Sequence, residues 1–290
     1  MKVKGGMGRY RKILVAIDGS EPGFDALRAA FKFAEAEKSW MTVVSVIPRY
    51  DGDLGAAWVD NIRESMRKPC AVALSEAEKI AKGEGASIKT VCEEGEIFER
   101  IVDIADAENC GLIVMGRKGR SQLERSLIGS VTARVIGHSQ RDVLVVPKGS
   151  TIGWESILLA TDGSKYSKPA TEKAIEFAKS YGSKLNAVSV VDVTDEFFAR
   201  APQAVEDLVN KARALVEEIR TKAASEGIEA ECLVREGESY KVIVDMAKER
   251  KAGAVIMGSH GRTGLRRLLM GSVTEKVIGN APCPVLVVKA

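Results

Sequence analysis

Two glycine-rich segments, 116–130 and 258–272, contain the residues whose spacing best suits the binding of an anion. In both, two glycines three positions apart are followed by nine residues and then by Gly-Ser: Gly116, Gly119, Gly129 and Ser130, and Gly258, Gly261, Gly271 and Ser272. Glycine lets the backbone approach a ligand closely, and the free N–H groups at the start of a helix attract phosphate. A surface loop closed by an ordinary helix cap would explain one such segment equally well. Because the spacing recurs, we interpret both segments as phosphate-binding loops.

Two carboxylates occupy matching positions elsewhere in the chain. Asp18 and Asp162 each follow a short apolar segment and precede Gly-Ser. One interpretation is a turn or helix-capping residue, a role that suits aspartate. The other is a carboxylate in the crevice beyond the carboxyl ends of the strands, where open α/β sheets bind ligands. Because a carboxylate repels phosphate, it would there face ribose hydroxyls, adenine or a phosphate-bound Mg²⁺ ion.

These residues recur because the sequence contains an internal duplication. Ile13–Ser20 returns as Ile157–Ser164, 144 residues later, and the glycine segments are 142 residues apart. A repeat of this length indicates a duplicated domain and excludes a solenoid, whose period is about 20–50 residues. We expect domains at 9–148 and 154–290, joined by a short linker.

Each half alternates short apolar segments, rich in Val and Ile, with amphipathic segments. We expect strands at 13–18, 42–47, 87–92, 111–115 and 143–146, and at 156–161, 185–191, 229–234, 254–258 and 285–288. In the first half we expect helices at 22–38, 59–83, 97–109 and 130–138. Apolar strands alternating with helices are typical of a parallel sheet covered on both faces. The pattern predicts two tandem, doubly wound, Rossmann-like α/β sheets.

Composition excludes several classes of protein. The 290 residues carry 43 Lys+Arg against 40 Asp+Glu, a net charge of +3, which is not that of a strongly basic nucleic-acid binder. We see no apolar run long enough to span a membrane and no secretory leader, and we expect a cytoplasmic protein.

Cysteine and histidine usage argues against a metal site. The five cysteines form no CxxC pair and are irregularly spaced, so we expect small buried thiols in a reducing compartment, not a disulfide framework or a zinc site. With only two histidines, His138 and His260, we expect neither a metal centre nor histidine-based catalysis.

On these residues, both halves resemble universal stress protein domains of the ATP-binding branch. The glycine segments, the aspartate after the first strand and the closing Val-Leu-Val-Val strands carry the resemblance, which covers nearly all of 9–290. It implies five parallel strands per half in the order 3-2-1-4-5. It also implies that a nucleotide contacts Asp18, Val46, Gly116, Gly119, Gly129, Ser130 and Val131 in the first half. The second set would be Asp162, Val190, Gly258, Gly261, Gly271, Ser272 and Val273.

The two halves are not identical. The first has Arg117-Lys118 where the second has Ser259-His260, and Arg141-Asp142 where the second has Cys283-Pro284. The added positive charge favours phosphate. Family members pair through their last strands, so the resemblance implies pairing of 143–146 with 285–288 within one chain. A homodimer of whole chains is left open.

The sequence therefore predicts a regulatory or stress-response protein that binds ATP or AMP, with Mg²⁺ as a companion of ATP, and hydrolyses it slowly or not at all. An ATP-hydrolysing or adenylating enzyme is the alternative, although the SGGxDS-type loop of such enzymes is absent. A flavin-binding electron carrier is another. Nucleic-acid binding would depend on loop cations: Arg117, Lys118, Arg120, Arg125, Arg262, Arg266 and Arg267. The irregular segment 50–58 is either a loose surface loop or a loop near the ligand.

Overall fold

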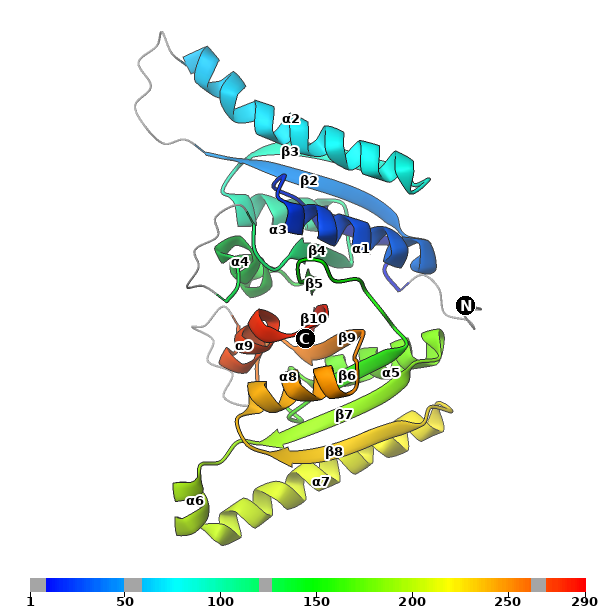
Figure 1. Ribbon diagram of the computed structural model, residues 1–290, viewed down its shortest axis with the longest axis vertical. Coiled ribbons are helices and arrows are strands. Elements are labelled where there is room, and N and C mark those ends of the chain that lie inside the picture. Colours follow the sequence, from blue (N-terminus) through cyan, green and yellow to red (C-terminus); the bar gives the residue numbers. More distant parts are fainter. Residues whose placement is uncertain (1–8, 50–58, 120–126, 262–269) are drawn as a thin grey trace. The chain divides into compact units, whose positions relative to one another are not determined.

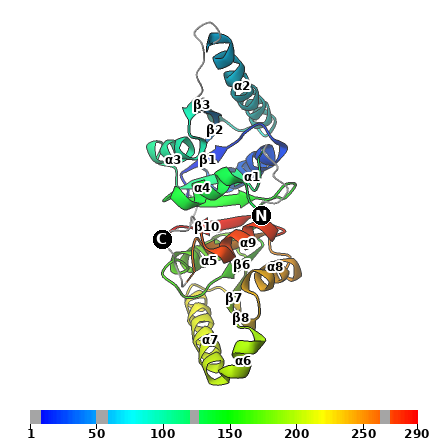
Figure 2. The same ribbon diagram turned by 90° about the vertical axis from the view of Figure 1, so that its left-hand side faces the viewer.

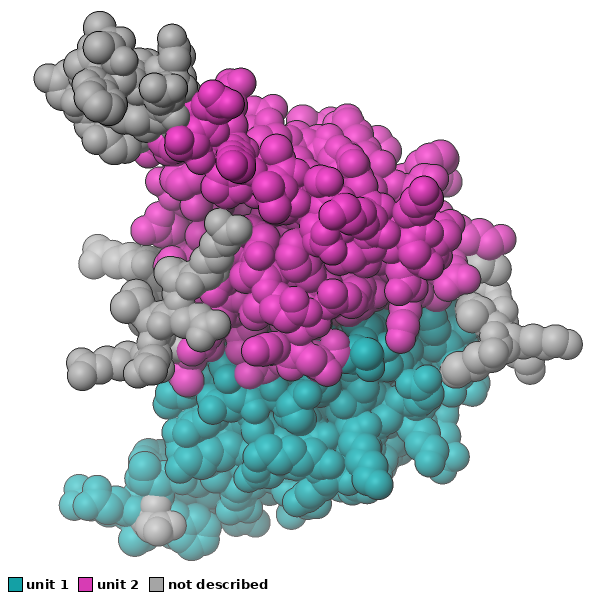
Figure 3. All heavy atoms as spheres, turned by 45° about the horizontal axis from the view of Figure 1, so that its top comes forward, with its two compact units in different colours: residues 1–6, 151–290 teal, residues 7–150 magenta. Residues whose placement is uncertain are grey.

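A computed structural model describes residues 9–49, 59–119, 127–261 and 270–290. The chain divides into two compact units, residues 7–150 and residues 151–290, coloured separately in Figure 3. No helix among the described residues is long and apolar enough to cross a membrane.

The first unit is a five-stranded parallel sheet between two layers of helices (Figures 1 and 2). Its elements in chain order are β1 (Lys12–Ala16), α1 (Glu21–Glu37), β2 (Trp40–Pro48), α2 (Val59–Gly83), β3 (Ile88–Gly95), α3 (Ile97–Ala107), β4 (Leu112–Gly116), α4 (Ser130–His138) and β5 (Asp142–Val146). The strand order is β3-β2-β1-β4-β5, which confirms the predicted 3-2-1-4-5 arrangement. α1 contacts α2, and α3 contacts α4. The order reverses between β1 and β4, which is where such sheets bind ligands.

The second unit repeats this architecture. Its elements are β6 (Ser156–Ala160), α5 (Lys168–Tyr181), β7 (Lys184–Val191), α6 (Asp195–Arg200), α7 (Pro202–Ser225), β8 (Ala230–Glu236), α8 (Ser239–Glu249), β9 (Ala254–Gly258), α9 (Ser272–Asn280) and β10 (Val285–Val288). The strand order β8-β7-β6-β9-β10 is again 3-2-1-4-5, with the printed pairs all parallel. The prediction of two tandem doubly wound sheets is therefore confirmed.

The central strands form because their side chains are apolar on both faces. Ile13, Leu14 and Val15 of β1 are fully buried, as are Ile157 and Leu158 of β6. Helix α1 begins where Ser20 accepts a hydrogen bond from the Gly23 amide, and its buried face is rich in alanine. Small side chains there let the helix pack closely on β1 and β4.

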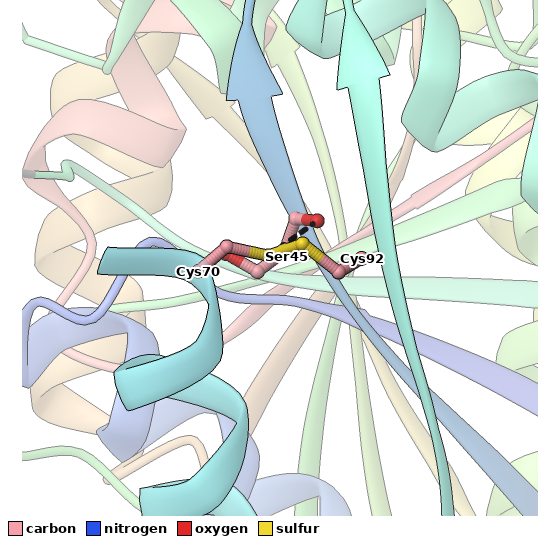
Figure 4. Close-up of a disulfide and its surroundings, with 3 residues drawn as sticks. All are labelled: Ser45, Cys70 and Cys92. Carbon is pink, nitrogen blue, oxygen red and sulfur yellow. Dashed lines mark hydrogen bonds between the residues drawn. A yellow bond between two sulfur atoms is a disulfide. The ribbon is translucent and has the colours of Figure 1, made fainter. Parts of the chain in front are cut away.

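One expectation from the cysteines is wrong. Cys70 of α2 and Cys92 of β3 form a disulfide with a Cα–Cα distance of 6.4 Å (Figure 4). Because α2 packs on β2 and β3, the fold joins two residues 22 positions apart whose local sequence shows no pairing pattern. Cys110, Cys232 and Cys283 are buried thiols, as expected.

The two units differ at the end of the sheet remote from the glycine segments. In the first, buried polar pairs join Arg9 to Glu37 and the Tyr10 hydroxyl to Asp142, the latter at 2.6 Å. In the second, three aromatic rings fill the corresponding region: Trp154, Phe177 and Tyr181. Asp142 thus has a structural partner that explains why the first half departs from the second at this position.

Candidate functional site

A cavity of about 530 Å³ opens at the carboxyl ends of β1, β2 and β4 in the first unit. Its volume lies in the ordinary range for small-molecule sites. Seven lining residues are those proposed from the sequence: Asp18, Val46, Gly116, Gly119, Gly129, Ser130 and Val131. The fold thus brings the whole predicted first set around one cavity.

Asp18 is hydrogen-bonded within the turn before α1 and also lies at the wall of the cavity. Its Oδ1 accepts hydrogen bonds from the backbone N–H and the hydroxyl of Ser20, at 3.0 and 2.5 Å. Ser20 in turn caps α1. These bonds fix the carboxylate at the cavity wall, where an acceptor can receive a hydrogen bond from a sugar hydroxyl or an exocyclic amine.

The glycines of the first loop are required by close approach of the chain to itself. A Cβ on Gly116 would lie 2.8 Å from the Pro22 carbonyl oxygen, and one on Gly119 would lie 2.3 Å from Asp18 Oδ2. A Cβ on Gly129 would touch the backbone of Arg117 and Lys118 at 3.4 Å. A side chain would therefore clash at Gly116 and Gly119, whereas at Gly129 it would meet only a tight contact.

Helix α4 directs its amino end into the cavity. Gly129 is the N-cap and offers no side-chain cap, and Ser130 is the first helical residue. The first N–H groups of an α-helix have no intrahelical acceptor, and the helix dipole adds partial positive charge. Ser130 and Val131 line the cavity at this end, which suits a phosphate group.

Thr132 holds this helix end against the loop, a role that sequence reasoning missed. Its Oγ1 donates a hydrogen bond to the Gly116 carbonyl oxygen at 3.1 Å, and Thr274 does the same to Gly258 at 3.0 Å. The signal was available, because Ser-Val-Thr follows the last motif glycine in both halves.

The second unit has a cavity of about 410 Å³ at the same place. Asp162, Val190, Gly258, Gly261 and Val273 line it, whereas Gly271 and Ser272 are not among its lining residues. Asp162 Oδ1 accepts from the Ser164 backbone N–H at 3.0 Å, and Gly271 is the N-cap of α9. The second predicted set is therefore brought together in large part.

The chain has clear relatives of the same architecture. The universal stress protein family matches residues 9–147 and again residues 153–289. This chain belongs to that family. A universal stress protein of Methanocaldococcus jannaschii is 36% identical over 47% of this chain and 82% of its own length. One of Mycolicibacterium smegmatis is 27% identical over 96% of both chains. The crystal structure of a universal stress protein from Archaeoglobus fulgidus superposes with a TM-score of 0.75, at 25% identity and 96% coverage of both chains.

The two cavities of this universal stress protein have different side walls. In the first, α2 and α3 contribute apolar groups: Met66, Pro69, Cys70, Ile97 and Ile101. In the second, the corresponding wall holds Leu208, Ala212 and Ile243. The sequence did not identify these residues, because they lie outside the recurring motifs and reach the cavity only through the packing of the helices.

The charged positions of the two loops also differ. Lys118 lines the first cavity, and His260 lines the second, where its ring lies 5.3 Å from that of Tyr166. Five cations proposed for the nucleic-acid alternative lie outside the described residues, as does the segment 50–58: Arg120, Arg125, Arg262, Arg266 and Arg267. No group of three or more potential metal ligands occurs among the residues that the structure describes.

Proposed function

We propose that each half of this universal stress protein binds one adenine nucleotide, ATP or AMP. One observation carries the proposal: a carboxylate, a glycine turn and the open amino end of a helix surround a single cavity in both units. A ring-sized apolar slot beside a phosphate-binding helix end is the combination that a nucleotide requires. The limits proposed for the two binding domains are 9–148 and 154–290.

The residues take distinct roles in this proposal. Adenine lies against the apolar wall near the main chain of Val46 or Val190, and Asp18 or Asp162 accepts a hydrogen bond from the nucleoside. The phosphates lie on the glycine turn and on the first turn of α4 or α9: Gly116, Gly119, Gly129, Ser130, Val131, Gly258, Gly261, Gly271, Ser272 and Val273. Mg²⁺ accompanies the phosphates of ATP.

We propose a regulatory role in which the bound nucleotide changes the surface that a partner contacts. Hydrolysis needs a group that orients water. Among the described residues, neither His nor Gln lines the first cavity, and His260 of the second has Lys118 as its counterpart. Turnover is therefore expected to be slow or absent.

The first experiment measures adenine nucleotide in the freshly purified chain by denaturation, chromatography and mass spectrometry. We expect about two equivalents in the natural protein and about one in each of Gly129→Val and Gly271→Val, which put a branched side chain at the helix N-cap. Gly83→Val is the matched control, because a Cβ at Gly83 meets nothing within 4 Å.

The possible results separate the alternatives. If neither purified nor ATP-supplemented protein holds nucleotide, the proposal is wrong. Release of pyrophosphate or phosphate at many turnovers per site would favour the adenylating or hydrolysing enzyme. Retention of ATP in the presence of a chelator would exclude a requirement for Mg²⁺.

The assembly is also a proposal, made from the sequence and from each unit's own strand order. In the five-strand order of its own unit, β5 is the last strand, next to β4. In the other unit β10 is the last strand, next to β9. An unpaired edge promotes association, so we propose that these two edges pair within one cytoplasmic chain. Sedimentation should then give a 31.2 kDa particle at all concentrations. A mass that doubles with concentration would indicate a homodimer of chains.

A further inference from the structure

The disulfide of the first unit lies in the wall of the candidate nucleotide cavity. Cys70 is 4% exposed and lines the cavity beside Met66 and Pro69 of α2. Its partner Cys92 is exposed and lies on β3. In the strand order of the first unit, β3 stands at one end and β5 at the other. The bond therefore connects a cavity-wall helix to a strand that solvent reaches (Figure 4).

The second unit has the same geometry without the bond. Cys92 is in register with Ser45 of β2, and the equivalent strand position opposite Ser189 of β7 is Val234. On the helix, Ala212 corresponds to Cys70 and likewise lines its cavity. Val234 packs against the apolar cluster that includes Ala212. The same architecture thus forms without the cross-link in the second unit, so the disulfide is a feature specific to the first.

We propose that Cys70–Cys92 is a redox modification site, that its reactant is a dithiol reductant, and that its state sets the nucleotide affinity of the first cavity alone. This inference rests on the proposed function. The oxidised protein is the tighter binder, and the second half keeps its affinity in both states.

The reaction conserves atoms and electrons. A thiolate of the dithiol attacks the sulfur of Cys92, the exposed residue of the pair, the Cys70–Cys92 bond breaks, and Cys70 leaves as a thiolate that takes up a proton. The second thiol of the reductant then attacks the reductant's first sulfur, which is bonded to Cys92 in the mixed disulfide. Cys92 is released as a thiolate and is also protonated. Two electrons and two protons pass to the protein, and the reductant becomes a disulfide.

Reduction changes the cavity wall in two ways. It removes the covalent tie between α2 and β3. Nucleotide binding to the reduced protein must then order a wall that the disulfide already fixes in the oxidised protein. It also gives Cys70 a proton. Cys70 Sγ lies 3.4 Å from the Ser45 carbonyl oxygen, a distance at which a thiol can donate (Figure 4). Ser45 directly precedes Val46, the proposed adenine contact, so the new bond acts on the strand that holds the base.

Two of the remaining cysteines do not compete for the reductant or for alkylating reagents. Burial raises the pKa of the Cys110 thiol to about 11 and also raises the pKa of Cys232. Such thiols are protonated at neutral pH and react slowly. Cys283 is also a buried thiol.

The test uses the full chain, in variants in which a substitution blocks nucleotide binding in one cavity at a time. ATP affinity is measured by calorimetry for Gly271→Val, whose first cavity remains, and for Gly129→Val, whose second cavity remains, before and after dithiothreitol. Alkylation and mass spectrometry report the state of Cys70 and Cys92. We expect reduction to raise the dissociation constant of the first cavity by about 5-fold or more and to leave that of the second unchanged.

Substitutions provide matched controls. Cys92→Ser, at an exposed position, should give the reduced affinity under all conditions. Cys70→Ala, which copies Ala212, provides a second variant with the same expected result. The pair Ala212→Cys with Val234→Cys should make the second cavity respond to dithiothreitol.

Hydrogen exchange of residues 64–83 gives a readout that needs no nucleotide, and faster exchange is expected after reduction. Failure of ATP to bind in either state overturns the proposed function and the affinity effect with it. Three results would overturn the modification site itself. These are a disulfide that resists dithiothreitol in the folded chain, two thiols that stay reduced under air, and hydrogen exchange that is the same in both states. Equal ATP affinity in both states overturns the coupling alone.

Discussion

Gly119 and Gly261 occupy equivalent positions but leave different amounts of room for a side chain. A Cβ would lie 2.3 Å from Asp18 Oδ2 in the first half and 3.0 Å from Asp162 Oδ2 in the second. In the first half the carboxylate is held by two hydrogen bonds from Ser20, so it cannot move aside without breaking them.

Gly119→Ala should therefore weaken nucleotide binding more than Gly261→Ala does. We expect a loss of about 10-fold or more in the first half, equivalent to 1.4 kcal/mol or more, and a smaller loss in the second. Calorimetric titration of each variant with ATP measures the loss of affinity in each half. An equal loss in the two halves would contradict the close packing of loop and carboxylate as its cause.

Glu37 is a buried charge whose partner is equally buried. Its side chain is fully buried, and that of Arg9 is 6% exposed. Glu37→Gln should destabilise the first unit by about 3 kcal/mol, because it removes the buried carboxylate that pairs with the Arg9 guanidinium. Urea unfolding measures the change. Arg9→Met combined with Glu37→Leu should recover most of it, and a double variant as unstable as the single one would argue against an electrostatic cause.

At this scale the sequence predicted the residues that recur and missed the residues whose role depends on packing. Asp18 and the glycines were found because the second half repeats them. The Cys70–Cys92 bond was not, because its partners come together only when α2 packs on β3. Likewise, the hydrogen bond of Thr132 to Gly116 joins residues 16 positions apart through the fold.

Matching ion pairs connect the same helices in both units. Glu96 precedes α3 and pairs with Arg134 of α4 at 3.0 Å; Glu238 precedes α8 and pairs with Lys276 of α9 at 3.3 Å. These helices border the two cavities, so each pair ties one cavity helix to the helix that we propose as the phosphate site.

The Glu238 pair should make stability depend on pH. Hydrogen bonding from Lys241, together with Lys276, lowers the pKa of Glu238 in the folded protein. A lowered folded-state pKa stabilises the protein above the unfolded pKa of about 4.3, and this stabilisation is lost as the pH falls through the folded value. Glu238→Gln should therefore melt at a slightly lower temperature at pH 7 and at the same temperature as the natural protein in acid.

Thermal unfolding from pH 3 to pH 8 measures this difference. Glu249→Gln, at an exposed position on the same helix, is the control for loss of one negative charge. A difference for Glu238→Gln that persists in acid would assign the effect to helix capping instead of the ion pair.

Strands and helices were predictable because apolar periodicity decides them. The expected segments 59–83 and 130–138 coincide with α2 and α4, and 254–258 and 285–288 coincide with β9 and β10. Helix α6 was not anticipated, because its six residues are too few to show a helical period.

For the whole molecule, duplication supplies two sites that have diverged in their walls. The first cavity is larger and bordered by a cross-linked helix, whereas the second has an uncross-linked alanine there. If both bind, ATP at about 100 times its dissociation constant should stabilise each half by about 2.7 kcal/mol. Scanning calorimetry of Gly129→Val should show this gain for the second half alone. An undiminished gain would place the nucleotide elsewhere.

The close approach of Gly116 to the Pro22 carbonyl has its counterpart in Gly258, whose Cβ would lie 2.3 Å from the Tyr166 carbonyl. Both glycines are needed to pack a strand end closely, against the first turn of α1 in one half and against the turn that precedes α5 in the other, whether or not a ligand is present. A descendant that stopped binding nucleotide would still be selected to keep them. After a loss of binding, we expect sequence changes instead at cavity-lining positions where the two halves already differ, such as 118 and 260.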